Sequence, residues 1–317
     1  MSTVLIIVAS LLLLGILAAS AVALHVTWRL THPVRKPIDM NPEDFGLVAA
    51  EAVVFPSRET TISLSGWYHS AARNGRTPNG RTLIFAHGYS QNRQEPHLPA
   101  LALASKLVQA GYDVLMFDFR NSGESTPALT TIGLREQHDL LGAIDFVAAK
   151  HPEQTIGLVG FSMGAATSLL VGGRDARIAA VVADSPFYSL SEYLEENLPQ
   201  WTGLPRFPFN WLILTLSPVF LRANPRHVKP FEIVRQAKKP ILFIHGTGDH
   251  TVPAENSKRL HALAEDEDSQ IWLVQHAGHV RSFALIPDEY AERVIAFLER
   301  GMGKTAGQSG KASILGK

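Results

Sequence analysis

The chain has 317 residues, of which 46% are hydrophobic, and its 29 Lys and Arg residues balance 29 Asp and Glu residues. This length suits one large domain or two small ones, and the hydrophobic fraction excludes a disordered chain. A net charge of zero argues against a nucleic-acid binder that relies on attraction to phosphates. The absence of Cys excludes disulfides, thiolate metal sites and a Cys nucleophile.

The amino-terminal segment carries no charge before Arg29, and Thr3 to Leu24 are 22 consecutive positions without Asp, Glu, Lys, Arg, Asn or Gln. A helix of that length spans roughly 33 Å, enough to cross a hydrocarbon core of about 30 Å. We therefore predict a transmembrane anchor over residues 1–28. A cleaved signal peptide is the alternative, because small residues stand at positions 18–23, although no Lys or Arg precedes the apolar run.

The nearest positive residues, Arg29, Arg35 and Lys36, follow the apolar run. The positive-inside rule then favours a single-pass membrane protein whose catalytic domain is cytoplasmic. If the opening is a signal peptide instead, the rest of the chain is secreted.

Residues 29–47 contain Pro33, Pro37 and Pro42 and are predicted to form a linker. A domain is predicted over residues 48–300, in which apolar strands alternate with helices, as in a mostly parallel sheet covered on both faces. Residues 185–239, rich in Pro and aromatics, interrupt this alternation and are predicted to be a helical cap, and residues 301–317 a disordered tail. The predicted strands are 52–55, 60–68, 82–86, 113–119, 154–160, 178–183, 240–245 and 270–275, and the predicted helices are 98–109, 134–150, 163–171, 255–264 and 287–300.

A G-x-S-x-G motif runs from Gly160 to Gly164 and places Ser162 between a predicted strand and a predicted helix. The glycines allow a sharp turn that exposes the Ser hydroxyl at the end of the strand. The start of the helix supplies positive partial charge where an oxyanion would form. We therefore predict that Ser162 is a nucleophile.

A nucleophilic Ser needs a base, and the base needs a carboxylate that orients it. Asp249 follows the 240–245 strand and His279 follows the next strand, so the chain order is Ser, Asp, His. We predict His279 as the base and Asp249 as the acid. Asp184, at the end of the 178–183 strand, is the rival acid, and we interpret it as a loop-capping residue.

The oxyanion hole is predicted to use the N–H groups of Met163, directly after the Ser, and of Tyr89, in the loop after the 82–86 strand. His87 and Gly88 begin that loop, and we predict that they support its structure, as do Gly160 and Gly164 at the turn. No His, Asp or Glu cluster has metal-ligand spacing, so no metal and no cofactor is predicted.

These motifs resemble those of the alpha/beta-hydrolase superfamily over about residues 48–300. The run from Asp118 to Ser125 also resembles that family's D-x-R-x-x-G-x-S loop, which positions the oxyanion loop. The resemblance implies an alpha/beta-hydrolase fold with eight mostly parallel strands. The anchor followed by this domain is similar to bacterial membrane-tethered serine hydrolases and, more loosely, to acyl-protein depalmitoylases, whose lipid-attached Cys cluster is absent.

The sequence therefore predicts a serine hydrolase that cleaves carboxylic esters or thioesters of small-molecule or lipid-like substrates through an acyl-enzyme intermediate. An apolar acyl substrate is favoured by the aromatic cap together with the anchor. A serine peptidase of the same fold is an alternative, and Glu192, Glu195 and Glu196 are its candidate contacts to a peptide amine. A non-catalytic binding protein on a hydrolase fold is the third possibility, which the intact Ser, Asp and His argue against.

Overall fold

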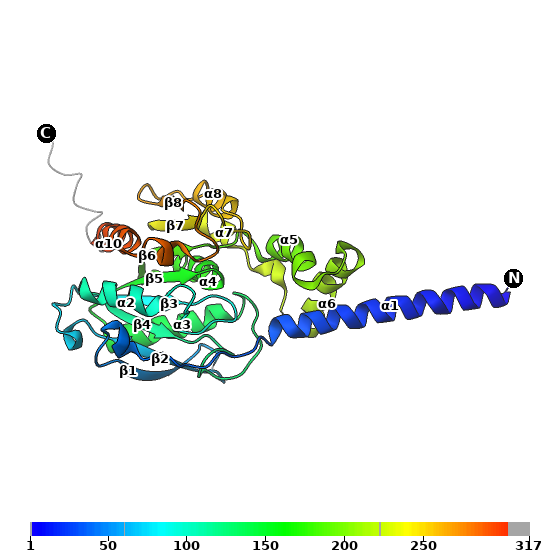
Figure 1. Ribbon diagram of the computed structural model, residues 1–317, viewed down its shortest axis with the longest axis horizontal. Helices are drawn as coiled ribbons and strands as arrows, with labels where there is room; N and C mark the ends of the chain where they lie inside the picture. The colour runs from blue at the N-terminus through cyan, green and yellow to red at the C-terminus, as the bar shows by residue number, and fades with distance from the viewer. Residues whose placement is uncertain (1, 60, 222, 304–317) are drawn as a thin grey trace.

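A computed structural model describes residues 2–59, 61–221 and 223–303 of the chain. Within these residues eight strands form one twisted sheet in the order β1-β2-β4-β3-β5-β6-β7-β8, and helices cover both of its faces (Figure 1). The strands are β1 (Glu51–Pro56), β2 (Ser63–His69), β3 (Arg81–Ala86), β4 (Asp113–Phe117), β5 (Thr155–Phe161), β6 (Ile178–Asp184), β7 (Ile241–Gly246) and β8 (Gln270–Val274).

The sheet is mostly parallel, as predicted. Only β2 runs against the other strands, since it pairs antiparallel with both β1 and β4, and β3 to β8 all run in one direction. Their carboxyl ends therefore meet at one edge. The central strand β5 is buried on both faces. Ile156 and Leu158 point into one apolar core, and Val159 and Phe161 point into the other.

One core lies under helices α3 and α4, and the other lies under α2 and α10. The helices of the body are α2 (Ala100–Gln109), α3 (Glu136–Lys150), α4 (Met163–Gly172), α8 (Glu255–His261), α9 (Ser282–Leu285) and α10 (Pro287–Gly303), with short helices η1 (Pro42–Phe45) and η2 (Ala72–Asn74). Each predicted strand and helix of the body is present, with ends that differ by a few residues. The strand predicted at 113–119 ends at Phe117, because the side chain of Asp118 bonds to neighbouring loops.

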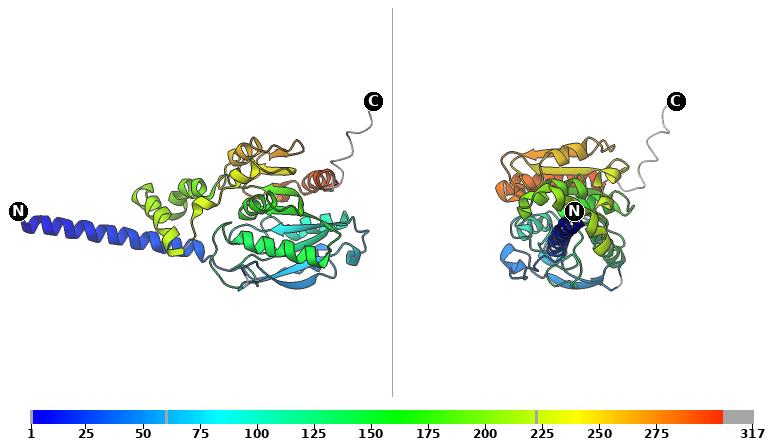
Figure 2. Two further views of the ribbon diagram at one scale, coloured as in Figure 1. Left: turned by 180° about the vertical axis from the view of Figure 1, so that it is seen from behind. Right: turned by 90° about the vertical axis from the view of Figure 1, so that its right-hand side faces the viewer.

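The first helix, α1 (Ser2–Thr31), projects away from the body over most of its length (Figures 1 and 2). It ends three residues beyond the predicted anchor boundary at residue 28. Among the described residues it alone is long and apolar enough to cross a membrane; its most apolar window has a mean hydropathy of 2.8 and is not buried.

The segment after α1 is docked against the body, where the sequence suggested a linker. Arg35 donates to the carbonyl oxygens of Gly123 and Ser125 at 2.5 and 2.7 Å. The amide of Asn92 donates to the carbonyl oxygen of Pro37 at 2.8 Å, and the amide of Gln94 donates to that of Met40 at 2.6 Å. Residues 35–40 therefore hold the end of α1 in a fixed place beside the loop that follows β3.

The insertion predicted at 185–239 lies between β6 and β7, on the side of the body from which α1 projects (Figure 1). It contains α5 (Leu190–Thr202), η3 (Arg206–Asn210), α6 (Trp211–Leu221), η4 (Pro225–His227) and α7 (Pro230–Val234). Both α6 and η3 contact α1. At the other end of the chain, α10 runs through Gly303, three residues into the predicted tail, and residues 304–317 of that tail lie outside the described residues.

Candidate active site

Ser162 sits in the sharp turn between β5 and α4. Its backbone has φ 52° and ψ −113°, a strained conformation for a residue with a side chain. The turn is held by the Ser162 N–H, which donates to the carbonyl oxygen of Asp184 at 2.9 Å. A Cβ on Gly160 would collide with the carbonyl of Gly164, and one on Gly164 would collide with the carbonyl of Ala86. Only glycine therefore allows these segments to approach so closely.

The structure brings Ser162, His279 and Asp249 into one hydrogen-bonded chain. The Oγ of Ser162 lies 2.9 Å from Nε2 of His279, and the Nδ1 of that ring lies 2.7 Å from Oδ2 of Asp249. Asp249 follows β7 and His279 follows β8, so the carboxyl ends of adjacent parallel strands carry both residues to the end of the sheet where Ser162 lies.

Asp249 is held in place as an ionised carboxylate. Its Oδ1 accepts hydrogen bonds from the backbone N–H groups of Thr251 and Val252 at 2.9 and 2.8 Å. Nε2 of His245 lies 3.3 Å from Oδ2. Burial by itself would raise the pKa of Asp249, but the hydrogen bonds from His245, His279 and the backbone outweigh burial and hold the pKa well below its ordinary value.

The rival acid, Asp184, makes other contacts. Its two carboxylate oxygens accept from the hydroxyls of Ser185 and Tyr290, each at 2.9 Å. Burial raises the pKa of Asp184 to about 6, against the opposing effect of these two hydrogen bonds. The structure thus places Asp249, and not Asp184, in hydrogen-bond contact with His279.

The loop after β3 lies beside Ser162 and is braced from several sides. His87 is buried and accepts from the N–H of Phe119 at 3.0 Å through Nε2, while its Nδ1 lies 2.8 Å from the carbonyl oxygen of Gly88. Burial lowers the pKa of His87, which suits a neutral, bracing ring. The N–H of Gly88 donates to Glu95 at 3.1 Å. The next N–H along this loop belongs to Tyr89, and both Tyr89 and Met163 line the pocket that contains Ser162. The N–H of Met163, the first residue of α4, has no intrahelical acceptor.

The predicted D-x-R-x-x-G-x-S loop joins this network through Asp118. Oδ1 of Asp118 accepts from the N–H of Arg93 at 2.8 Å, and Oδ2 accepts from the N–H of Glu124 at 2.9 Å. The buried guanidinium of Arg93 lies 3.2 Å from the same carboxylate. This ion pair ties the end of β4 to the loop after β3.

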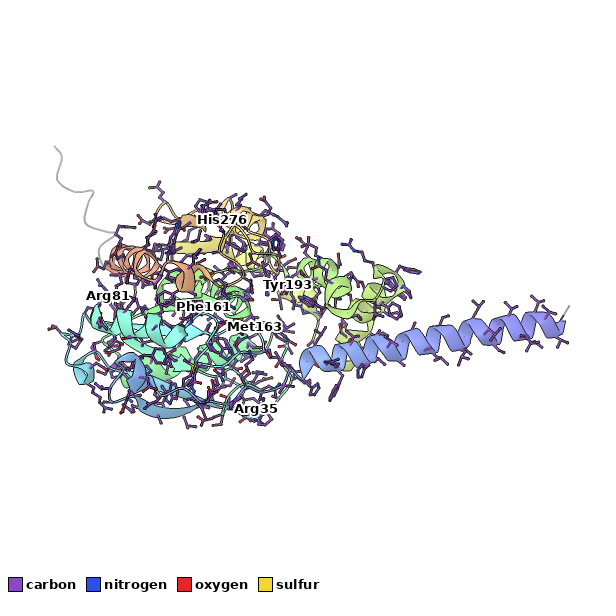
Figure 3. All side chains as sticks on the ribbon, viewed as in Figure 1. Arg35, Arg81, Phe161, Met163, Tyr193 and His276 are labelled. Atoms are coloured by element: carbon purple, nitrogen blue, oxygen red, sulfur yellow. The ribbon has the colours of Figure 1, made fainter. Side chains whose placement is uncertain are left out.

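A pocket of about 480 Å³ opens over Ser162, between the body, the cap and the end of α1. That volume lies within the range of small-molecule sites. In Figure 3, Met163 lies at the end of the body that faces the cap, and Tyr193 of α5 lies on the side of the cap toward it, whereas Arg81 lies toward the opposite end of the body. Phe187, Tyr193 and Trp201 form the aromatic wall of the pocket over Ser162. Phe187 stacks on Tyr193 with ring centroids 5.4 Å apart.

Sequence reasoning missed two residues that line this pocket, Leu30 of α1 and Glu95 of the loop after β3. The carbonyl of Leu30 accepts from the hydroxyl of Tyr89 at 2.7 Å, which joins the anchor helix to the oxyanion loop. Glu95 is buried, and burial raises its pKa to about 8. Within residues 2–59, 61–221 and 223–303 no group of three or more His, Cys, Asp or Glu side chains is arranged to hold a metal ion.

Comparisons with known proteins agree with this architecture. A family model described as alpha/beta hydrolase fold matches residues 81–222. The chain is 30% identical to the uncharacterized protein YfhR of Salmonella typhi, over 80% of this chain and 82% of that protein. It is 26% identical to lysophosphatidylserine lipase ABHD12 of Macaca fascicularis, over 62% of this chain and 48% of that protein. The esterase Pf2001 of Pyrococcus furiosus is similar in structure, with a TM-score of 0.71 and 28% identity over 86% of this chain and 100% of that chain.

Proposed function

We propose that this chain, which belongs to the alpha/beta-hydrolase family, is a serine hydrolase that cleaves carboxylic esters or thioesters through an acyl-enzyme intermediate. The observation that carries the proposal is the hydrogen-bonded chain from Ser162 through His279 to Asp249. The similarity to an esterase and to a lipase supports an ester substrate over other substrates of the fold.

In the first half of the proposed reaction, Oγ of Ser162 attacks the substrate carbonyl carbon while Nε2 of His279 takes the Ser proton. Asp249 accepts the hydrogen bond from Nδ1–H, fixes the tautomer of the ring and stabilises the imidazolium. The N–H groups of Met163 and Tyr89 stabilise the oxyanion. The imidazolium then protonates the leaving alkoxide or thiolate, which leaves an acyl group on Ser162.

In the second half, His279 takes a proton from a water molecule as that water attacks the acyl-enzyme. The same two N–H groups stabilise the second oxyanion, since it forms at the same carbonyl. Collapse of this intermediate returns the proton to Ser162 and releases the carboxylic acid.

A peptidase of the same fold finds less support in the site. Glu192 forms an ion pair with Arg259 at 2.8 Å. Glu195 and Glu196 are exposed on α5, and neither they nor Glu192 line the pocket over Ser162. The role of a non-catalytic binding protein is also disfavoured, because Ser162 and Asp249 each lie within hydrogen-bond distance of His279.

We also propose that α1 is a membrane anchor and that the body lies on the cytoplasmic side. The anchor is favoured over a cleaved signal because the helix continues without a break past the candidate cleavage positions, and Ala23 in that stretch is wholly buried on a helix that contacts the cap. The cytoplasmic side is favoured by Arg29, Arg35 and Lys36, which follow the apolar run. A reporter fused after Lys317 tests the orientation, and reporter activity on the external side would refute it.

The proposed activity is tested with a fluorophosphonate probe on the detergent-solubilised full chain. Wild type is expected to be labelled and Ser162→Ala is not. Ser63→Ala, which changes an exposed Ser at the start of β2, serves as the control and is expected to be labelled like wild type. Labelling of Ser162→Ala at the wild-type level would refute the proposal. Hydrolysis of aminoacyl anilides, without hydrolysis of p-nitrophenyl esters, would establish the peptidase instead.

A further inference from the structure

Helix α1 changes its surroundings at Ala23. Residues 3–22 are exposed or half-buried, whereas Ala23, Thr27 and Thr31, spaced four residues apart, form a stripe buried against the rest of the chain. At 1.5 Å per residue the twenty residues before Ala23 span about 30 Å, the thickness of a hydrocarbon core. The body and the cap therefore begin at the level where a bilayer would end.

The last turns of α1 also form part of the substrate pocket. Leu30 lines the pocket that contains Ser162, and it lines a second, smaller cavity of about 50 Å³ that lies toward the projecting part of α1. Ile132 lines both cavities as well, so the two share a wall. The two adjoining cavities, here called the path, therefore lie one after the other from Ser162 along the end of the anchor helix.

The smaller cavity of this path has a largely apolar lining. The hydroxyls of Thr27 and Thr31 donate to backbone carbonyls one turn earlier in α1, at 2.8 and 2.9 Å, so they present their methyl groups without an unmet hydrogen bond. The opposite wall, formed by the cap, includes Leu194 from α5 and Ile213 from α6. Such a lining offers little to a polar ligand, because a polar group there would lose its hydrogen bonds to water, but it suits a hydrocarbon chain.

The outer surface of the cap is suited to the boundary between a bilayer and water. Phe207 of η3 and Trp211 of α6 are exposed, 80% and 60% respectively, on elements that contact α1, and Trp28 of α1 is also exposed. Aromatic rings of this kind gather where a bilayer meets water. The left view of Figure 2 shows the cap beside the part of α1 nearest the body, and α6 and η3 contact α1 directly.

We propose that the end of α1 and the cap form a binding site for one long, unbranched acyl chain of a lipid ester that resides in the bilayer. The chain lies between Leu30 and Ile213, its ester group reaches Ser162, and the substrate enters from the bilayer beside α1. The anchor is then a part of the substrate site as well as a tether. This inference rests on the proposed ester hydrolysis and specifies its substrate.

The first test uses the full chain in phosphatidylcholine vesicles with p-nitrophenyl butyrate and p-nitrophenyl dodecanoate. Leu30→Trp narrows the path and is expected to lower the dodecanoate-to-butyrate ratio of kcat/KM about tenfold, equivalent to about two methylenes no longer buried. Ile213→Trp, on the opposite wall, is expected to do the same. Leu14→Trp, in the part of α1 exposed outside the body, is the control and should keep the ratio within about twofold.

The outcomes separate the two proposals. An unchanged ratio in both wall variants, with butyrate still hydrolysed, overturns the acyl site alone. Failure of wild type to hydrolyse either ester, with no Ser162-dependent labelling, overturns the proposed function and this inference with it.

A second measurement does not depend on turnover or on how well the wall variants fold. The Ser162→Ala chain in the same vesicles is irradiated with dodecanoic acid that carries a terminal diazirine, and the adducts are located by mass spectrometry. Adducts are expected within residues 27–31 and on Ile213. Adducts confined to residues 3–22, which are exposed to the bulk bilayer, would overturn the inference.

Discussion

Replacement of Asp249 by Asn is predicted to trap His279 in an unproductive tautomer. The amide is nearly the same shape as the carboxylate, and two backbone N–H groups, from Thr251 and Val252, point at Oδ1 from 2.9 and 2.8 Å. The amide oxygen must take this position, because an NH₂ group there would face two donors. The NH₂ group then takes the place of Oδ2, which lies 2.7 Å from Nδ1 of His279.

An NH₂ group can only donate, so Nδ1 of His279 must accept and the ring proton moves to Nε2. That proton faces Oγ of Ser162 at 2.9 Å, and Nε2 can no longer take the Ser proton. By analogy with the same substitution in other triads, kcat is expected to fall about 10⁴-fold, or about 5 kcal/mol in the activation free energy.

The assay is the kcat for p-nitrophenyl butyrate, with far-UV circular dichroism and the thermal unfolding midpoint as checks of folding. Asp184→Asn is the matched control, since it changes a second buried carboxylate at the end of the neighbouring strand β6. Its kcat is expected to fall far less. A kcat of Asp249→Asn within tenfold of wild type, or an equal loss in Asp184→Asn, would show that the tautomer reasoning is wrong.

Two further predictions concern the loop after β3 and the turn at Ser162. Burial raises the pKa of Glu95 to about 8. Between the ordinary carboxyl pKa and pH 8, the folded chain therefore keeps a proton that the unfolded chain has lost. The free energy of unfolding falls as pH rises through this range. Glu95→Gln should flatten the pH dependence of the free energy of unfolding between about pH 5 and pH 8, by up to about 1.4 kcal/mol per pH unit, in urea titrations; an unchanged slope in that range would contradict the burial of this carboxyl. Gly164→Ala should destabilise the chain by about 1–3 kcal/mol, because the new Cβ meets the carbonyl of Ala86. A Gly-to-Ala change inside an ordinary helix stabilises it by about 1 kcal/mol. A lower urea midpoint would therefore support the predicted collision with Ala86, and a higher midpoint would contradict it.

The sheet and the three residues around Ser162 could be predicted because their signals are local. Parallel strands buried on both faces are runs of apolar residues, and their carboxyl ends carry Ser162, Asp249 and His279 in a fixed order along the chain. The placement of these residues at one edge follows from strand direction alone. Strand ends were less predictable, as at Phe117, because the strand there stops where the side chain of Asp118 finds partners in other loops.

The role of the anchor in the pocket could not be predicted, because it depends on contacts between distant segments. Leu30 follows a uniformly apolar run, and this pattern does not indicate which other segment Leu30 contacts. In the structure its carbonyl oxygen accepts a hydrogen bond from the hydroxyl of Tyr89, 59 positions along the chain. Glu95 stands in a polar loop, where an acidic residue normally indicates surface, and only the folded chain shows that it is buried. The docking of residues 35–40 could not be predicted for the same reason, because Pro33, Pro37 and Pro42 indicate a linker but not what it contacts.

The docking of residues 35–40 has a consequence for how the rate should be measured. Because this segment holds the body to the end of α1, a chain anchored in a bilayer cannot tumble away from it, and its active site samples substrate in two dimensions. The turnover rate should then follow the mole fraction of substrate within the membrane, and dilution of the vesicles in buffer at constant lipid composition should leave it unchanged.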